Sequence, residues 1–223
     1  MVALNLISIN ARGLNTPHEG TIILEFLRKK NMHFATIQES HLMHKDAGRM
    51  ANKFYHPIAT SSATTKYKGV MVLCKCNLKF NLIGSWADDA GRIAIAKICM
   101  EGKNIAFISA YAPNTYDAAF YDMVTKSMLD LAGFHLVLDF SIYSGRHKTF
   151  SQLDFIFASK DLFRNVQNAY YVPVAWSDHK PIYFKIILKR QWCPLAGTSH
   201  NTPISKTSTG FVSRLSVSAA AHL

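Results

Sequence analysis

The chain has 223 residues, of which 49% are hydrophobic, and this is enough for one substantial domain with its own core. No apolar run reaches the roughly 18 residues of a membrane span, and the N-terminus lacks the basic start and cleavage site of a signal peptide, so we expect neither. The formal net charge of +11 favours a polyanionic partner, most commonly nucleic acid.

Strands and helices alternate along the first half of the chain. The stretch ALNLISIN predicts a strand that ends near Asn10, and HEGTIILEFLRKKN predicts a helix with Asn31 as its C-cap. HFATIQES predicts a strand that ends on Glu39, KDAGRMANKFY a short helix, and GVMVLCK a buried strand. RIAIAKICM and NIAFISAYAP predict a hairpin whose second strand ends near Tyr111.

The second half predicts a helix, a group of strands and a tail. DAAFYDMVTKSMLDLAG has the pattern of a helix closed by Gly133, and SKDLFRNV that of a short helix with Ser159 as its N-cap. HLVLDF, QLDFIFAS and PIYFKIIL read as strands, and AYYVPVAW as a strand or an extended edge. From residue 189 to 223 the sequence becomes rich in Ser and Thr without an apolar period, so we expect disorder there. The mixed order favours an α/β or α+β fold in which two sheets pack face to face with helices outside.

The four cysteines do not indicate a framework of disulfides or a zinc site. Cys74 and Cys76 lie two residues apart in a strand-like CKC, which is poor spacing for either. We expect reduced thiols, and therefore a nuclear or cytoplasmic protein.

Several predicted strands end on a residue that binds metals or phosphates. These are Asn10, Glu39, Tyr111, Asp139 and Asp154, and Ser177-Asp178-His179 precedes the last strand. One Asp after a strand is usually a turn or cap residue, with odds of about three in four. Because sheets commonly gather functional groups at one rim, the repetition favours a shared site.

These segments resemble a known family. SINARGLN, IQESHL, AYAPN, LVLDF, SQLDFIFAS and WSDHKPI are similar, in this order, to the signature segments of the endonuclease/exonuclease/phosphatase superfamily. The strongest resemblance is to the endonuclease domain of LINE-type retrotransposons, a relative of the DNA-repair apurinic/apyrimidinic endonucleases and exodeoxyribonuclease III. It covers residues 1–188, and it implies a four-layer sandwich of two mixed β-sheets flanked by helices.

The resemblance also implies roles for individual residues in a hydrolase that uses Mg²⁺ or Mn²⁺. Asp139 would orient or deprotonate the attacking water, and Tyr111 would contact the scissile phosphate. Asp154 would hold the imidazole of His179, which would stabilise or protonate the phosphoryl group. The implied metal-binding set is Asn10, Glu39, Asp139, Asp178 and His179. Mg²⁺ prefers such oxygen ligands and needs only one or two carboxylates.

The chain departs from the family pattern around Asp139. The family has Gly-Asp-Phe-Asn where this chain has Leu138-Asp139-Phe140-Ser141, so an Asn that contacts the phosphate is replaced by a shorter side chain. The family also has some tens of residues between this motif and the next strand, and here the domain is shortened near residues 141–145. We therefore expect one truncated flank with exposed apolar strand surface, and weakened activity.

The sequence is compatible with three functions. The first is an endonuclease that hydrolyses the DNA backbone, and the second is a catalytically decayed basic module that binds nucleic acid. The third is a phosphatase of inositol phosphates or a sphingomyelin-type phosphodiesterase, for which no headgroup motif is present. We expect a monomer that binds DNA, with no membrane partner and no organic cofactor. Candidate DNA contacts are Arg12, Arg146, His147 and Lys148.

Two other features have plain structural interpretations. Trp176 is placed to stack on a sugar or base, but packing beneath the loop of His179 is the commoner role for such a residue. His41, His44, His56 and His135 lack metal-ligand spacing, and we interpret them as surface or core residues.

Overall fold

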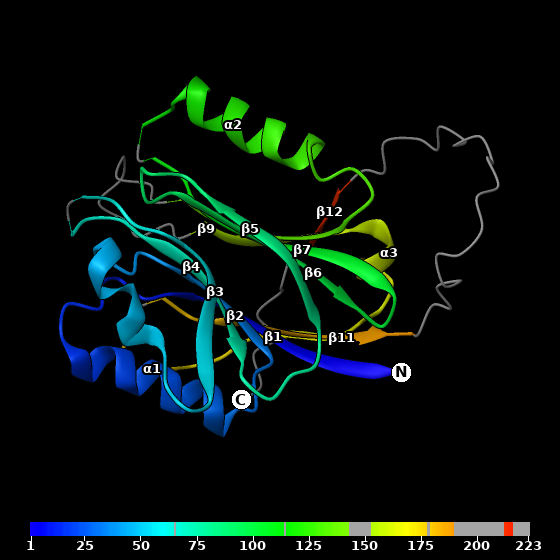
Figure 1. The fold of residues 1–223 in the computed structure, drawn as a ribbon, viewed down its shortest axis with the longest axis horizontal. Coiled ribbons are helices and arrows are strands. Elements are labelled where there is room, and N and C mark those ends of the chain that lie inside the picture. The colour runs from blue at the N-terminus through cyan, green and yellow to red at the C-terminus, as the bar shows by residue number, and fades with distance from the viewer. Residues whose placement is uncertain (65, 114, 143–152, 178, 190–211, 216–223) are drawn as a thin grey trace.

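The computed structural model describes residues 1–64, 66–113, 115–142, 153–177, 179–189 and 212–215. Two six-stranded mixed sheets pack face to face in these residues, and a helix covers the outer face of each (Figure 1). This arrangement confirms the predicted α/β sandwich. Among the described residues, no helix is both long enough and apolar enough to cross a membrane.

The first sheet has the strand order β10-β11-β1-β2-β4-β3, and only β1 and β2 pair in parallel. Its strands are β1 (Val2–Asn10), β2 (Phe34–Gln38), β3 (Tyr55–Ser61), β4 (Val70–Lys75), β10 (Val166–Tyr171) and β11 (Ile182–Leu188). The second sheet has the order β12-β9-β8-β7-β6-β5, with β7 and β8 parallel. Its strands are β5 (Asn81–Ala87), β6 (Ile93–Met100), β7 (Lys103–Tyr111), β8 (His135–Ile142), β9 (Leu153–Ser159) and β12 (Val212–Leu215).

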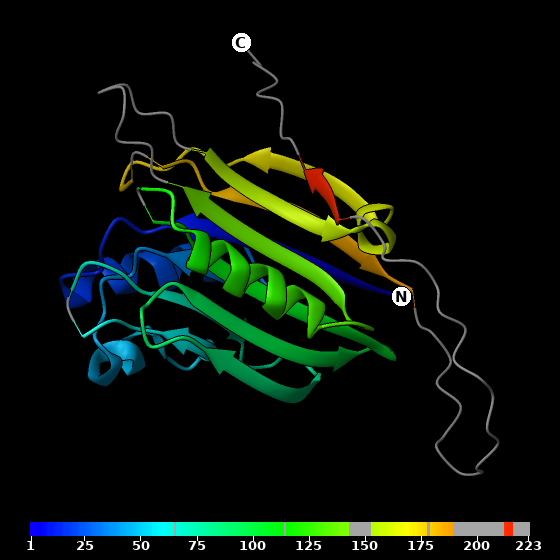
Figure 2. The ribbon, with the colours of Figure 1, turned by 90° about the horizontal axis from the view of Figure 1, so that it is seen from above.

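Two longer helices form the outer layers. Helix α1 (Pro17–Lys29) begins with a capping box between Thr16 and Glu19 and packs its apolar stripe on the first sheet. Helix α2 (Ala118–Leu129) is N-capped by Asp117 and lies across the second sheet, as Figure 2 shows. The shorter elements are the 3-10 helix η1 (His44–Met50) and α3 (Lys160–Phe163).

The inner faces of the sheets change from apolar to polar towards one end of the strands. On β1, Leu4 and Leu6 belong to the core between the sheets, and Ser8 and Asn10 follow on the same face. The same change occurs along three further strands, in the series Phe34-Thr36-Gln38, Phe107-Ser109-Tyr111 and Val137-Asp139-Ser141. The apolar end forms the core between the sheets, and the polar end gathers side chains that can bind a ligand.

Four strands differ from the predictions. Strand β10 starts at Val166 and ends at Tyr171, whereas a strand or an extended edge was expected over AYYVPVAW. Strands β3 and β5 were not predicted, and β3 starts at Tyr55, inside the stretch expected to be helical. Within the segment 189–223, for which disorder was expected, the structure describes the strand β12, which pairs with β9.

The expected exposure of apolar surface beside the shortened segment is also not seen on β8. Its outward residues Leu136, Leu138 and Phe140 are buried in the cluster that includes α2. Among the described residues, exposed large apolar side chains include Leu82, Ile83 and Trp86 on the edge strand β5, and Phe163 of α3, which follows β9.

Candidate active site

The polar ends of several strands meet at one rim of the sandwich. The parallel pairs β1–β2 and β7–β8 bring their carboxyl ends to this rim, where Asn10 pairs with Gln38 and Tyr111 with Ser141. The antiparallel strand β9 starts there, because Asp154 pairs with Ser141. This rim is on the left in Figure 1, where β1 ends and α1 begins.

Asn10 connects the two sheets at the rim. Its Nδ2 donates to Glu39 Oε1 over 2.8 Å and to Ser141 Oγ over 3.3 Å, and its Oδ1 accepts from the Arg12 backbone N–H over 3.0 Å. Asn10, Glu39 and Ser141 are all buried. The amide of Asn10 therefore holds the Glu39 carboxylate, which follows a strand of the first sheet, close to the Ser141 hydroxyl of the second sheet.

Glu39 lies just beyond β2, which ends at Gln38 rather than at Glu39 as predicted. Its φ is 49°, and His41 has a φ of 54°, so the segment after the strand turns sharply. Three backbone hydrogen bonds hold this turn, from Gly13 N to Glu39 O, from Leu14 N to Ser40 O and from Ser40 N to the carbonyl of Gly69. Strained backbone of this kind is common at functional sites.

Asp139 lies deeper between the sheets and is 1% exposed. Gln38 Nε2 donates to Asp139 Oδ2 and also lies 3.3 Å from Ser109 Oγ. Sequence reasoning missed Gln38 and Ser109. The sequence feature that could have indicated them is a polar residue at an inward-facing position of a strand that is otherwise apolar.

Tyr111 is fixed by a residue that the sequence analysis also missed. Arg92 Nη1 donates to the Tyr111 carbonyl over 3.1 Å, and the guanidinium carbon lies 5.8 Å from the centre of the Tyr111 ring. The Tyr111 N–H in turn donates to the carbonyl of Arg92. The phenol is thus anchored at the end of β7, opposite Ser141 of β8.

The segment before β11 brings His179 to the same rim. Its backbone N–H donates to Ser177 Oγ over 3.1 Å, and that hydroxyl donates to the carbonyl of Asn10 over 3.4 Å. His179 is 6% exposed. The predicted contact between His179 and Asp154 stays a prediction, because only the backbone of Asp154 is placed. Asp178, Arg146, His147 and Lys148 lie outside the described residues.

His41 was interpreted as an ordinary surface or core residue, but it lies beside Glu39. Its Nε2 is 3.9 Å from Glu39 Oε2. Burial lowers the pKa of His41, and the nearby Glu39 carboxylate opposes this effect. Burial therefore favours a neutral imidazole, which leaves the negative charge of Glu39 available to a cation.

The oxygen donors at the rim fit a hard divalent cation. Among the described residues, no group of three or more His, Cys, Asp or Glu side chains is arranged to hold a metal. The Glu39 carboxylate and the Asn10 amide lie together, however, and Mg²⁺ typically takes one or two carboxylates and keeps several waters. The donor set therefore suits Mg²⁺ or Mn²⁺ better than a metal that needs sulfur or several imidazoles.

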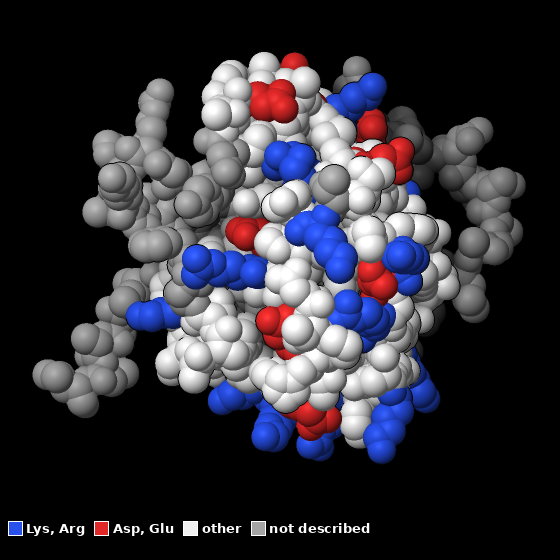
Figure 3. Space-filling view, turned by 90° about the vertical axis from the view of Figure 1, so that its left-hand side faces the viewer, with Lys and Arg blue, Asp and Glu red and all other residues white. Residues whose placement is uncertain are grey.

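The surface around the rim carries mixed charge. Figure 3 views this side of the molecule and shows Lys and Arg spread over it, with Asp and Glu between them. Arg12, which follows Asn10, is exposed. On this face, the positive side chains are therefore spread among acidic and uncharged residues.

Comparisons with known proteins show the fold. No family model matches the sequence. The structure is similar to an AP endonuclease from Leishmania major, with a TM-score of 0.66 and 14% identity over 84% of this chain and 88% of that one. It is similar to a 3′ phosphatase from Neisseria bound to a product DNA hairpin, with a TM-score of 0.62 and 13% identity over 83% of this chain and 100% of that one.

A third similar structure is the endonuclease domain of TRAS1, a telomere-specific non-LTR retrotransposon. The TM-score is 0.58 and the identity 12%, over 83% of this chain and 99% of that domain. At such identities the likeness concerns the fold alone. The chain has the fold of the endonuclease/exonuclease/phosphatase superfamily.

Proposed function

We propose that this chain, built on the fold of the endonuclease/exonuclease/phosphatase superfamily, is a metal-dependent phosphodiesterase that hydrolyses the backbone of DNA. The observation that carries the proposal is the position of Asn10, whose amide joins Glu39 of one sheet to Ser141 of the other. Similar structures include proteins named for action on DNA, and the net charge of +11 favours a polyanionic substrate.

Glu39 and Asn10 would hold Mg²⁺ or Mn²⁺, with Asp178 and His179 as further candidates. When bound, such an ion neutralises the charge that develops on the phosphate and on the leaving oxygen. The turn that gives Glu39 a φ of 49° keeps its carboxylate next to Asn10. Asn10 keeps its own orientation because the Arg12 backbone N–H donates to its carbonyl oxygen.

Asp139 is the residue that we propose to orient or deprotonate the attacking water. The hydrogen bond from Gln38 fixes its carboxylate, and its burial favours a stable orientation. Tyr111, anchored by Arg92, would contact the phosphate, and His179, held by Asp154, would protonate or stabilise the phosphoryl group.

Ser141 is expected to make this reaction slower than in the family that the sequence resembles. Its hydroxyl lies 3.3 Å from Asn10 Nδ2, at the position where the family has an Asn that contacts the phosphate. Loss of one such donor typically costs about 10²–10³-fold in rate. We therefore expect slow turnover rather than none.

The first prediction concerns nicking of supercoiled plasmid DNA by the full chain. Nicking should require Mg²⁺ or Mn²⁺, stop on chelation, and fall by about 10²-fold or more in Glu39→Gln and in Asp139→Asn. Asp130→Asn, at the exposed C-cap of α2, removes the same charge far from the rim and should leave the rate unchanged. Thermal unfolding of each variant checks that it is folded.

The alternative is a basic module that binds nucleic acid without cutting it. It is favoured by the absence, in the described part of the chain, of a three-residue metal cluster, and by Ser141 in place of the family's Asn. Nicking that survives both carboxylate substitutions would indicate a contaminant and support this alternative. DNA binding without any metal-dependent nicking would support it as well.

A further inference from the structure

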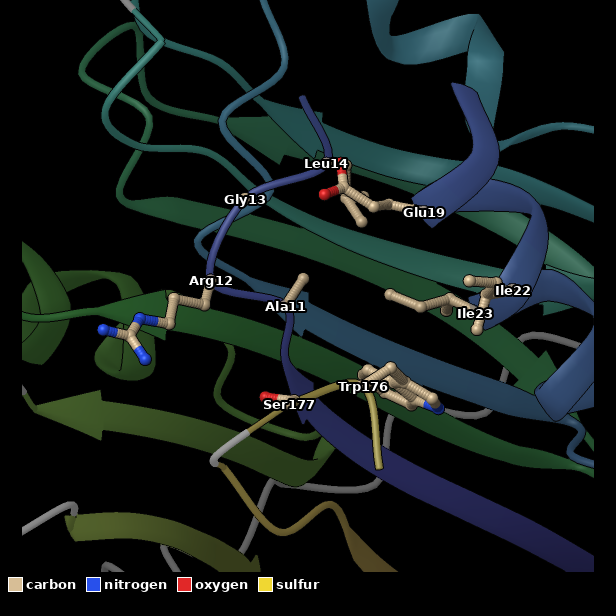
Figure 4. Close-up of a pocket in the computed structure, with 9 residues that line it drawn as sticks. All are labelled: Ala11, Arg12, Gly13, Leu14, Glu19, Ile22, Ile23, Trp176 and Ser177. Carbon is tan, nitrogen blue, oxygen red and sulfur yellow. The ribbon is translucent and has the colours of Figure 1, made fainter. Parts of the chain in front are cut away.

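A small pocket opens next to the rim, between the loop that follows β1, the first turns of α1 and the segment before β11 (Figure 4). Its volume is about 180 Å³. Ile22 and Ile23 of α1 form one side, Trp176 another, and Leu14 with Glu19 the end away from Trp176. Pockets for drug-sized ligands have about 300–1,000 Å³, so this one has room for a single ring system.

The pocket shares its wall with the proposed catalytic rim. Ser177 lines it, and the Ser177 hydroxyl donates to the carbonyl of Asn10. Arg12 also lines it through the loop, and its backbone N–H donates to Asn10 Oδ1. A group bound in the pocket would thus adjoin two residues that hydrogen-bond to Asn10, the metal ligand that we propose.

The negative charge of Glu19 at the pocket disfavours a phosphate and is compatible with a neutral ring. Figure 4 shows that the guanidinium of Arg12 points away from the pocket, whereas the carboxylate of Glu19 stays beside Leu14 at its edge. The carboxylate accepts a hydrogen bond from the Thr16 backbone N–H over 2.7 Å, and two carboxylate oxygens have capacity for further donors. An amino group on the ring suits this position.

The remaining walls are apolar and offer a flat surface. Trp176 packs edge-on against Phe26, with ring centres 5.7 Å apart, and this contact holds the indole in place. A preset indole is a stacking platform for a planar ring. Stacking of a base on an aromatic side chain is tolerant of sequence and contributes substantially to the binding of unpaired strands.

We propose that this pocket binds an unpaired nucleobase of the DNA strand, next to the phosphate that lies at the rim. This inference rests on the proposed function and specifies its substrate as DNA with an unpaired base beside the cleaved bond. Trp176 stacks on the base, and Glu19 accepts from its exocyclic amino group. Adenine, cytosine and guanine carry such an amino group and thymine does not, so the pocket favours these three bases over thymine.

The test measures binding of the full chain to short fluorescein-labelled duplexes in EDTA, where cleavage cannot interfere. A duplex with one bulged adenine should bind about 10-fold more tightly than the fully paired duplex or one with a bulged thymine. Ile22→Phe fills the pocket and should abolish this preference while leaving affinity for the paired duplex unchanged. Thr21→Phe is the control, because Thr21 is exposed and does not line the pocket.

Glu19→Gln provides a second test that keeps the helix start intact, since Gln also completes a capping box. It should bring the affinities for the adenine and thymine bulges together. Equal binding of bulged and paired duplexes by the unmodified chain would overturn the inference, as would an Ile22→Phe variant that weakens both duplexes equally. Metal-dependent nicking without any bulge preference would sink the pocket assignment alone, and bulge preference without nicking would sink only the catalytic proposal.

Discussion

At the scale of single residues, neutral amide side chains donate hydrogen bonds to two acids of the rim. Asn10 donates to Glu39, and Gln38 donates to Asp139, so each acid is oriented by an amide from the first sheet. An amide fixes a carboxylate without cancelling its charge, whereas a Lys or Arg would neutralise it. This choice of partners keeps the rim attractive to a cation and suits the proposed hydrolysis.

His33 allows a prediction about pH at the residue scale. Its Nδ1 accepts from the Asn5 backbone N–H over 2.9 Å, and burial, with a smaller effect of Lys75, lowers the pKa of the imidazole. The folded state therefore binds this proton less readily than the unfolded state, whose His pKa is about 6.5. As pH falls below that value, the free energy of unfolding should fall, by at most about 1.4 kcal/mol per pH unit for this group.

The variant His33→Asn isolates this effect, because Asn keeps an acceptor near the Nδ1 position but does not titrate. Urea unfolding at a series of pH values should show a shallower loss of stability in His33→Asn than in the unmodified chain. His44→Asn, at an exposed position, serves as the control for removal of one histidine. If both variants lose stability as steeply as the unmodified chain, the assignment to His33 is wrong.

At the scale of elements, the turn after β2 depends on Gly69, which precedes β4. Its carbonyl accepts from Ser40 N over 2.9 Å, its φ is 139°, and a Cβ there would collide with the Ser40 hydroxyl. Gly69→Ala should lower the free energy of unfolding by about 2–4 kcal/mol and displace Glu39, so nicking should fall as well.

Gly133 is the matched control for that substitution. It also has a positive φ, of 88°, but a Cβ there meets nothing within 4 Å. Gly133→Ala should lower the free energy of unfolding by about 1 kcal/mol, from backbone strain alone, and should leave the rate of nicking unchanged. Urea midpoints and nicking rates measure both effects. Equal loss of stability in the two variants would show that contact with Ser40 does not matter.

The elements that sequence reasoning found and missed differ in regularity. The alternation of apolar and polar residues in LNLISIN identified β1. The hairpin of β6 and β7 was identified too, and its turn at Glu101 and Gly102 has a positive φ at both residues. The missed strands β3 and β5 are sheet edges, and each contains an irregularity of register, after Pro57 and after Leu82. A bulge shifts the side-chain alternation by one residue, so the period-2 signal disappears within so short a strand.

At the scale of the molecule, sequence alone identified polar strand ends but not their partners. Asn10 and Ser141 are 131 positions apart, and Gln38 and Asp139 are 101 apart. Strand periodicity places each of these residues on an inward face, but their pairing depends on how two sheets pack against each other. The resemblance named Asn10 and Asp139 as site residues, whereas Gln38, Ser109 and Arg92 became visible only when the sheets were placed together.

The charge of the whole molecule leads to a prediction about DNA affinity. Neutralisation of phosphates by Lys and Arg releases counterions, so the binding constant should fall steeply as salt rises. Arg12 is exposed beside Asn10, and we expect it to contact one phosphate. Arg12→Ala should weaken binding to all sequences similarly and reduce the slope of log K against log salt by about 1.

Lys30 is the matched control for Arg12, because it is exposed and caps the end of α1 away from the rim (Figure 1). Lys30→Ala changes the net charge by the same amount, so long-range attraction falls equally in the two variants while only Arg12→Ala removes a phosphate contact. Fluorescence anisotropy across a salt series separates these effects. A binding constant that does not change with salt, or equal slopes for the two variants, would mean that DNA does not bind over the rim. The proposed active site would then not face the DNA.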